Sequence, residues 1–422
     1  MAAGPGRRMG RITSFGTDMH SGNTPKPALP VVNRPNISRI IDQMVGRGVT
    51  DFWVTSHHMA GDIIRIVGHG ERYGAGIRIR HVVEDALVHT ALATKQIADN
   101  FGEDEPFWVL SGDISSPLTN FGAFFTNFQN AQKTNPLIAG CVGFALRPAR
   151  QIVNRYTTAI INRDNLVEEF REPPTSEAEA LSIFREIQNE TISRVSDQLG
   201  QPVLPINSST YLMTRRIFQL VAEPDTNPSV LYDFGRYIFP NAPACSISAY
   251  FIPENVSGDR LEESWTDIGF PEDLWRANFR LIRYAPYLIQ GKYAPEKRSW
   301  IGSGCKIRGQ VEDSVIGNNV FIGPGIHVKD CIIGPGSTLE GLRLLKGSVV
   351  LPYTYVNTRR YARRVEEITY SLLISRSTGG TFIDQHSTGT RKIEGRLAVP
   401  DIDGQIKLDD LILSADDLKI LA

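Results

Sequence analysis

FWVLSGD, residues 107–113, reads as a short apolar β-strand that runs directly into a turn. Four apolar residues in succession, closed by a glycine, are typical of a buried strand. Asp113 follows the strand after two residues, behind Gly112, a residue type that allows the chain to turn sharply. These residues therefore predict a strand whose carboxyl end presents a single carboxylate.

Strands and helices alternate on both sides of this segment. The apolar spacing predicts helices over 36–47, 88–98 and 121–133, strands over 50–55, 76–83 and 137–146, and a long amphipathic helix over 176–199. Such alternation is typical of an α/β protein in which helices cover both faces of a sheet. We expect a Rossmann-like fold with a mixed, mostly parallel sheet. Because ligands of such sheets bind at the carboxyl ends of strands, Asp113 is a candidate site residue.

The composition is that of an ordinary globular protein. The 422 residues are 41% hydrophobic and 22% charged, with a formal net charge of -1. This balance does not indicate a nucleic-acid or acidic-membrane partner. The four cysteines lie far apart and lack metal-binding spacing, which suits a reducing compartment. No apolar run is long enough to span a bilayer, and we expect a cytoplasmic protein.

The amino-terminal residues suit a polyphosphate ligand. Gly4 and Gly6 allow the backbone to approach an anion closely, and Arg7 and Arg8 add fixed positive charge. Lys26 is a compact cation between two prolines. Taken alone, these residues are equally well explained as a disordered, arginine-rich tail, because a short Gly-x-Gly is a weak signal.

A second isolated aspartate lies in WTDIG, residues 265–269, within a turn bounded by glycine and proline. By itself, either Asp113 or Asp267 is also explained as a turn former or a helix cap. The case for a shared site depends on the other motifs of the chain.

The pattern changes near Trp300. Aliphatic residues recur mostly at six-residue steps, with two irregular steps of nine and five, at positions 301, 307, 316, 322, 328, 333 and 339. A leading aliphatic residue at this period is typical of a parallel β-helix. We therefore predict an α/β domain over 1–290, a β-helix over 291–355 and a carboxyl-terminal extension of unknown role over 356–422.

The order of the motifs resembles that of the nucleoside-diphosphate-sugar pyrophosphorylases, or sugar-1-phosphate nucleotidyltransferases. The matching segments are AGPGRRM (3–9), PKP (25–27), LSGD (110–113) and WTDIG (265–269). An α/β domain followed by a left-handed parallel β-helix is similar to the glucose-1-phosphate adenylyltransferase branch. The resemblance implies transfer of a nucleoside monophosphate from an NTP to a sugar-1-phosphate, giving an NDP-sugar and pyrophosphate. Because a β-helix has open ends and apolar layers, we also expect a homo-oligomer, a dimer or tetramer, assembled through it.

The resemblance also implies roles for single residues. Asp113 and Asp267 would hold Mg²⁺, which prefers carboxylate and phosphate oxygens. Arg8 and Lys26 would stabilise charge on the phosphates of the nucleotide. Further contacts to the nucleotide would come from Gly4, Gly6, Arg7, Leu87, Val88, His89 and Gly112, and contacts to the sugar phosphate from Glu172 and Asn207.

Several departures from the family pattern bear on substrate choice. Val88 replaces a family glycine that lies next to the nucleotide base, so the sequence does not specify which base is bound. Pro173 stands where the family has a lysine that binds the sugar phosphate, and proline offers neither charge nor donor. Asn207 is kept, but the glycine that follows it in the family is lost. Family members also begin with an apolar strand before the glycine loop, so we expect the natural start to lie upstream of Met1.

These departures leave three functions open. An altered acceptor side suggests an unusual sugar-1-phosphate or a sugar-like cyclitol-1-phosphate. It is equally compatible with a catalytically weakened regulatory or scaffold subunit. An acyltransferase built on the β-helix would depend on His327, and the few coils and single histidine argue against it.

Overall fold

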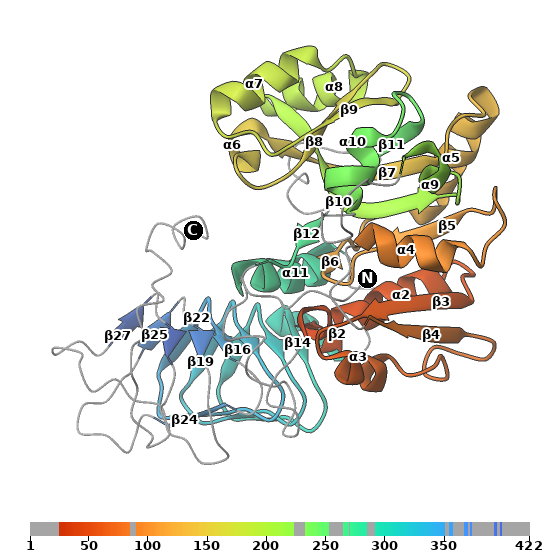
Figure 1. The fold of residues 1–422 in the computed structure, drawn as a ribbon. Helices are drawn as coiled ribbons and strands as arrows, with labels where there is room; N and C mark the ends of the chain where they lie inside the picture. Colours follow the sequence, from red (N-terminus) through yellow and green to blue (C-terminus); the bar gives the residue numbers. More distant parts are fainter. Residues whose placement is uncertain are drawn as a thin grey trace. The chain divides into compact units, whose positions relative to one another are not determined.

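The computed structural model describes residues 25–84, 90–222, 233–252, 265–269, 271–284, 292–350, 354–357, 367–369, 372–373, 392–394 and 397–398. The described chain forms two compact units. The first unit runs from Ile37 to Asp267 (Figure 1). The second unit consists of the described residues up to Asn36 and those from Ile268 onward.

A six-stranded mixed sheet forms the centre of the first unit, in the order β11–β7–β10–β8–β9, with β5 also paired to β10. Its strands are β5 (Phe107–Leu110), β7 (Gly140–Pro148), β8 (Thr158–Ile161), β9 (Val167–Arg171), β10 (Val203–Met213) and β11 (Ile247–Ile252). Every residue of β7 is buried, as expected for a strand covered on both faces.

The predicted mixed sheet is confirmed, but the prediction that it is mostly parallel is corrected by the described strands. Only β11 and β7 are parallel within this sheet. Strand β10 runs antiparallel to β5, β7 and β8, and β8 runs antiparallel to β9. The reason is that the reversed central strand β10 makes three antiparallel pairs and β8 and β9 make a fourth, and the alternation of strands and helices does not encode which strands reverse.

Helices cover both faces of this sheet. Helix α5 (Phe121–Thr134) packs Phe124 and Phe128 in a cluster with Cys141 of β7. The next residue, Val142, belongs to another cluster, which includes buried side chains of α4 (Thr90–Ala98) and α8 (Glu190–Leu199). Neighbouring strand residues point to opposite faces, so these helices lie on opposite sides of the sheet.

The remaining elements of the first unit flank the sheet. Strands β3 (Asp51–Ser56) and β4 (Arg78–Val83) form a parallel pair. The other described elements are α2 (Asn36–Val45), α3 (Ala60–Val67), β6 (Ile114–Ser115), α6 (Ala149–Ile152), α7 (Glu177–Glu186), α9 (Ile217–Leu220), η3 (Phe234–Ile238), α10 (Phe239–Asn241) and β12 (Thr266–Asp267).

The single helix predicted over 176–199 is wrong: two helices, α7 and α8, occupy this segment. Asn189 separates them because its side-chain oxygen accepts hydrogen bonds from the backbone N–H groups of Thr191 and Ile192. This bonding caps α8 and requires Asn189 to leave the helical conformation.

The second unit contains η2 (Lys26–Ala28), β1 (Pro30–Val31), β2 (Arg34–Pro35) and α11 (Pro271–Tyr284). The buried Asn278 of α11 joins the segment up to Asn36 to the segment that begins at Ile268. Its side-chain oxygen accepts a 2.6 Å hydrogen bond from the backbone N–H of Val32, and its amide donates to the carbonyl oxygen of Leu274.

Short strands after residue 291 stack into three ladders that fit a β-helix. One ladder begins with β13 (Lys292–Ala294), antiparallel to β14 (Ser299–Ile301), and every later described pairing is parallel. This ladder continues with β17 (Val315–Ile316), β20 (Ile332–Ile333), β23 (Val349–Val350), β26 (Leu372–Leu373) and β28 (Leu397–Ala398). The second ladder consists of β15 (Lys306–Ile307), β18 (Phe321–Ile322), β21 (Thr338–Glu340) and β24 (Tyr355–Asn357). The third ladder consists of β16 (Gln310–Glu312), β19 (His327–Lys329), β22 (Leu344–Lys346), β25 (Glu367–Thr369) and β27 (Lys392–Glu394). Ladder strands therefore extend beyond residue 355.

The register explains the irregular steps in the sequence pattern. Val311 pairs with Val328, and Val328 pairs with Leu345, so these coils repeat after 17 residues. The buried aliphatic residues advance by five, six and six positions around each coil, for example at 311, 316, 322 and 328. The step of nine arises because Val311 also points into the core, between Ile307 and Ile316.

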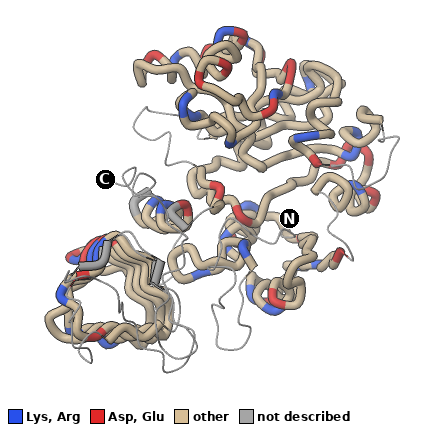
Figure 2. The backbone as a smooth tube through the Cα atoms, turned by 60° about the vertical axis from the view of Figure 1, so that its left-hand side comes forward, with Lys and Arg blue, Asp and Glu red and all other residues tan. Residues whose placement is uncertain are grey.

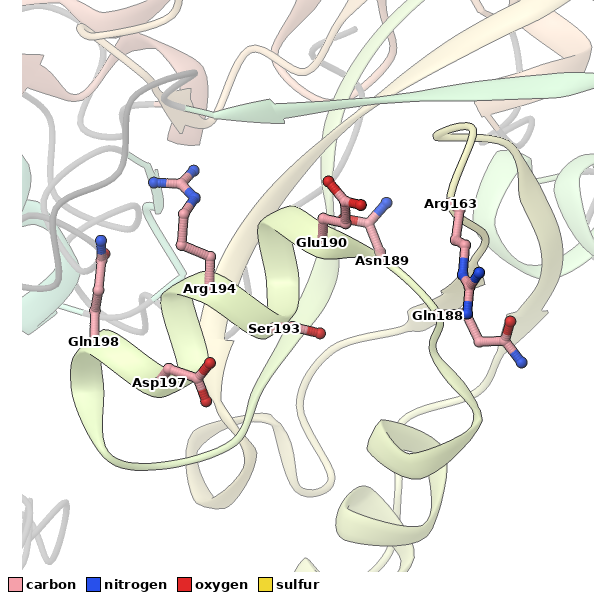
Figure 3. Close-up of a pocket in the computed structure, with 8 residues that line it drawn as sticks. All are labelled: Arg163, Gln188, Asn189, Glu190, Ser193, Arg194, Asp197 and Gln198. Atoms are coloured by element: carbon pink, nitrogen blue, oxygen red, sulfur yellow. The ribbon is translucent and has the colours of Figure 1, made fainter.

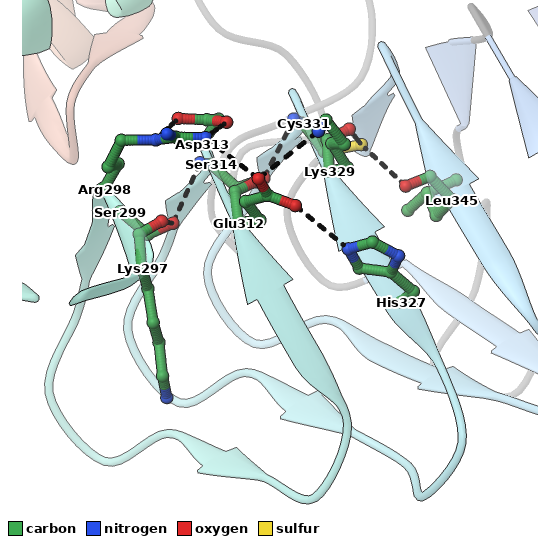
Figure 4. Close-up of polar contacts among 10 residues, drawn as sticks. All are labelled: Lys297, Arg298, Ser299, Glu312, Asp313, Ser314, His327, Lys329, Cys331 and Leu345. Atoms are coloured by element: carbon green, nitrogen blue, oxygen red, sulfur yellow. Dashed lines mark hydrogen bonds and ion pairs between the residues drawn. The ribbon is translucent and has the colours of Figure 1, made fainter.

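Small polar side chains and ion pairs support one corner of the coils (Figure 4). The hydroxyl oxygen of Ser299 accepts a hydrogen bond from the backbone N–H of Ser314, and that of Ser314 accepts one from Cys331. Burial raises the pKa of the Cys331 thiol to about 12. Outside the core, Glu312 forms ion pairs with Arg298 at 2.9 Å and Lys329 at 3.3 Å.

Acidic and basic residues are interspersed along the described backbone of both units (Figure 2). Among the residues that the structure describes, no helix is both long and apolar enough to cross a membrane.

Candidate functional site

The two predicted metal-binding aspartates are joined through a short antiparallel strand pair in the first unit. Strand β6 (Ile114–Ser115) pairs with β12 (Thr266–Asp267), so that Asp267 lies opposite Ile114. Asp113 directly precedes Ile114. One strand spacing and one residue step separate the two positions, which places their Cα atoms within roughly 9 Å of each other.

The turn after β5 holds Asp113 in position. The Ser111 hydroxyl donates a 2.6 Å hydrogen bond to a carboxylate oxygen of Asp113. The backbone N–H of Ser111 donates to the carbonyl oxygen of Ser209 in β10, at 3.2 Å. The turn is therefore attached to the central sheet, and the carboxylate of Asp113 is half-buried.

A buried tryptophan anchors the segment that carries Asp267. Trp265 is only 2% exposed, and its indole N–H donates to the carbonyl oxygen of Ser208 at 2.8 Å. Arg147, itself buried, donates to the carbonyl oxygen of Trp265 at 2.7 Å. Both ends of the Trp265 residue are thus tied to sheet strands, two positions before the half-buried Asp267.

Asn207, predicted to contact the acceptor, lies in an irregular part of β10. The register between β10 and β7 shifts between Asn207 and Tyr211. Within this bulge the side-chain oxygen of Asn207 accepts a 2.9 Å hydrogen bond from the backbone N–H of Ser209, whose φ of 55° is left-handed. Ser209 is also the residue that accepts a hydrogen bond from Ser111, so the bulge lies beside the Asp113 turn.

Glu172, the other predicted acceptor residue, is exposed and directly follows β9. Arg171 pairs with Thr158 of β8, and Thr158 pairs with Ile206 of β10. Glu172 and Asn207 each directly follow a residue of this row of paired positions, and β9 and β10 are roughly 10 Å apart.

Asp233 was missed by the sequence analysis. One of its carboxylate oxygens accepts hydrogen bonds from the backbone N–H groups of Gly235 and Arg236, and the other accepts a 2.9 Å bond from the Thr90 hydroxyl. Thr90 begins α4, directly after the segment predicted to contact the base. An aspartate two residues before a glycine at the start of η3 was the available signal.

Apart from Gly112, the remaining predicted site residues lie in the second unit or outside the described residues. Lys26 lies at the start of η2 in the second unit. The other nucleotide-contacting candidates lie outside the described residues, apart from the buried Gly112; they are Gly4, Gly6, Arg7, Arg8, Leu87, Val88 and His89. In the described part of the chain, no group of three or more His, Cys, Asp or Glu side chains is arranged to hold a metal.

A separate pocket of about 640 Å³ lies on the surface of the first unit, beside α8 (Figure 3). None of the predicted site residues lines it. Its lining is polar and mostly exposed, and consists of Arg163, Gln188, Asn189, Glu190, Ser193, Arg194, Asp197 and Gln198.

The first unit is an α/β domain in which the strand that follows Asp113 pairs with the strand that carries Asp267. Helices on both faces of a mixed sheet define its architecture as α/β. The family model described as "Nucleotidyl transferase" matches residues 1–283, and the chain belongs to that family.

Sequence identity to individual relatives is 30% or lower in the three comparisons that follow. The chain is 30% identical over 150 residues to a glucose-1-phosphate adenylyltransferase of Clostridium perfringens, a match that covers 31% of this chain and 37% of that relative. It is 22% identical over 394 residues to a UTP–glucose-1-phosphate uridylyltransferase of Synechocystis, covering 90% of this chain and 88% of the relative. A solved structure of a putative glucose-1-phosphate thymidylyltransferase from Bacillus anthracis is 20% identical, with a TM-score of 0.46, and the match covers 66% of this chain and 91% of that chain.

Proposed function

We propose that this protein is a nucleotidyltransferase that joins a nucleoside monophosphate from an NTP to a sugar-1-phosphate or cyclitol-1-phosphate, and releases pyrophosphate. The observation that carries the proposal is the β6–β12 pair, in which Asp267 lies opposite the residue that follows Asp113. Membership of the nucleotidyl transferase family supports it independently.

The donor set fits a hard divalent cation. Members of the family generally use a divalent metal, and we propose that it is Mg²⁺ here, held by Asp113 and Asp267. The two carboxylates, one strand spacing and one residue step apart, would supply oxygen ligands, and phosphate oxygens of the substrates would complete the coordination. Mg²⁺ supplies neutralisation of phosphate charge when it is bound.

The chain's own residues mainly align the reactants. The acceptor phosphate oxygen attacks the α-phosphorus of the NTP, and pyrophosphate leaves, so little proton transfer is needed. We assign to Arg8 and Lys26 the stabilisation of negative charge on the nucleotide phosphates. We assign the backbone at Gly4 and Gly6, with Arg7, to nucleotide binding, and Leu87, Val88 and His89 to the base.

Glu172 and Asn207 are proposed to orient the acceptor. Both directly follow the paired row Arg171–Thr158–Ile206, and the bulge at Asn207 lies beside the Asp113 turn, which supports this assignment. We further propose that the nucleotidyltransferase domain spans 1–290, that the β-helix is left-handed, and that it joins copies of the chain into a dimer or tetramer in the cytoplasm.

A pyrophosphate-release assay tests the proposal. Each of the common NTPs is combined with α-D-glucose 1-phosphate, other sugar-1-phosphates and myo-inositol 1-phosphate, with and without Mg²⁺. We expect metal-dependent pyrophosphate release with at least one pair. Silence across the whole panel from a folded protein would instead support the regulatory or scaffold subunit.

A further inference from the structure

The phosphate of the proposed acceptor needs a positive charge close to Glu172 and Asn207. Neither of these side chains supplies one, and the adjacent Pro173 is uncharged. In the transfer step the acceptor phosphate approaches another phosphate, so a cation at this point lowers the electrostatic repulsion between them. The following inference rests on the proposed function and identifies a cation for this role.

The loop between α6 and β8 joins the two acceptor segments. The backbone N–H of Asn154 donates a 2.8 Å hydrogen bond to the carbonyl oxygen of Pro174. Three residues later, the carbonyl oxygen of Thr157 accepts a 3.2 Å hydrogen bond from the backbone N–H of Asn207. Arg155 lies between these two attachment points, with one end of its loop beside the Glu172 segment and the other beside Asn207.

Aromatic contacts connect the Arg155 side chain to the segment that carries Asp267. The guanidinium carbon of Arg155 lies 5.1 Å from the centre of the Tyr156 ring. The Tyr156 ring in turn contacts Trp265 edge to face, with ring centres 5.7 Å apart. Trp265 comes two residues before Asp267. Stacking on an aromatic ring orients a guanidinium while it keeps its charge, and the Arg155 residue is exposed.

We propose that Arg155 binds the phosphate monoester of the acceptor, with Tyr156 as its platform. A guanidinium has the planar donor geometry that binds two phosphate oxygens at once. Arg155 would thus provide the positive charge that the lysine, replaced here by Pro173, provides in the resembling family. The ligand class is a sugar or cyclitol carrying a single phosphate.

The test compares Arg155→Ala with Arg163→Ala, an exposed arginine elsewhere in the same unit. With the best substrate pair from the panel, Arg155→Ala is expected to raise the KM for the acceptor roughly 10- to 100-fold. The KM for the NTP should stay within about twofold in both variants. Thermal unfolding of each variant verifies that the fold is kept.

A double variant tests the charge itself. Placing a lysine beside the Asn154 contact, in Arg155→Ala/Pro173→Lys, should recover at least part of the lost acceptor affinity. Failure of this rescue, or an unchanged acceptor KM in Arg155→Ala while turnover continues, would overturn the inference and leave the proposed function standing.

Isothermal titration calorimetry measures acceptor binding directly, so it tests the role of Arg155 without requiring the transfer reaction. Wild type and Arg155→Ala are titrated with α-D-glucose 1-phosphate, myo-inositol 1-phosphate and unphosphorylated glucose. Phosphate-ester binding that requires Arg155 supports the inference even if no pyrophosphate is ever released. Equal binding by both proteins, or no binding by wild type, counts against Arg155.

Discussion

The β-helix of the second unit depends on contacts between residues close in the sequence, whereas the candidate site of the first unit depends on contacts between distant segments. In the β-helix, Val311, Val328 and Leu345 stack directly, and each contact joins residues one coil apart in the chain. In the first unit, the candidate site needs the turn at Asp113, the bulge at Asn207 and the segment before Asp267. The comparison teaches that a periodic pattern locates a stacked core, whereas the chemistry depends on pairings between distant segments.

The same contrast separates the expected effects of mutations. A change in the aliphatic stack removes buried apolar contact and lowers stability. A change of a half-buried carboxylate in the candidate site removes charge and lowers activity, because that side chain is not part of a hydrophobic core. The three variants below test this separation.

The largest effect is expected for Asp113→Asn. The amide has the shape of the carboxylate but lacks the charge that a hard divalent cation prefers, so pyrophosphate release should fall by roughly 1,000-fold or more. Thermal unfolding should change little. Asp164→Asn, in an exposed turn of the same unit, is the matched control and should retain activity. Activity of Asp113→Asn within tenfold of wild type would remove Asp113 from the metal site.

A stability effect of intermediate size is expected in the β-helix. Leu339 is fully buried in the aliphatic stack, and its neighbour Thr338 points outward from the same strand. Leu339→Ala should lower the free energy of unfolding by about 2–5 kcal/mol, because it leaves a cavity between two coils. Thr338→Ala should change it by less than about 0.5 kcal/mol. Urea unfolding followed by tryptophan fluorescence measures both, and equal effects would contradict the assigned register.

The smallest effect is expected at a corner of the β-helix, for Asp330→Asn. Burial raises the pKa of the Asp330 carboxyl, and the charge of Asp313 raises it further. A raised pKa in the folded state means that stability is full below the unfolded pKa near 4 and falls as the pH rises through the folded value. The variant removes the charge, and asparagine tolerates the left-handed φ of 54° at this position.

Asp330→Asn should therefore raise the Tm at pH 7 by on the order of 1 °C, and the gain should disappear below about pH 4. Asp313→Asn is the control, since the Asp313 carboxylate pairs with Arg298 at 2.6 Å and its loss should not stabilise the protein. A lower Tm of Asp330→Asn at pH 7 would show that the charge of Asp330 is favourable.

Much of the local structure was predictable. The strand at 107–110, the helix at 121–134 and the buried aliphatic positions of the coils follow from patterns within short segments. The helix predicted over 176–199 failed because a single side chain, Asn189, can either continue a helix or cap a new one. Its hydrogen bonds to the turn at Asn162 and Asn165, which hold it in the capping position, come from outside the helix.

The candidate site was predictable only as a set of residues. Family resemblance indicated Asp113, Asp267, Glu172 and Asn207, but not the strand pairing between them. Asp233 and Arg155 carried no comparable signal, because each contacts its partners through the fold: Thr90 for Asp233, and the Tyr156–Trp265 pair for Arg155.

By itself, the sequence determined the alternation of strands and helices, the aliphatic stack of the coils and the order of the acidic motifs, since each depends on neighbours along the chain. Only the tertiary structure decided that β10 reverses and that β6 pairs with β12. Those choices depend on hydrogen bonds between strands that are distant in the sequence, and no short segment records which partner its backbone will meet.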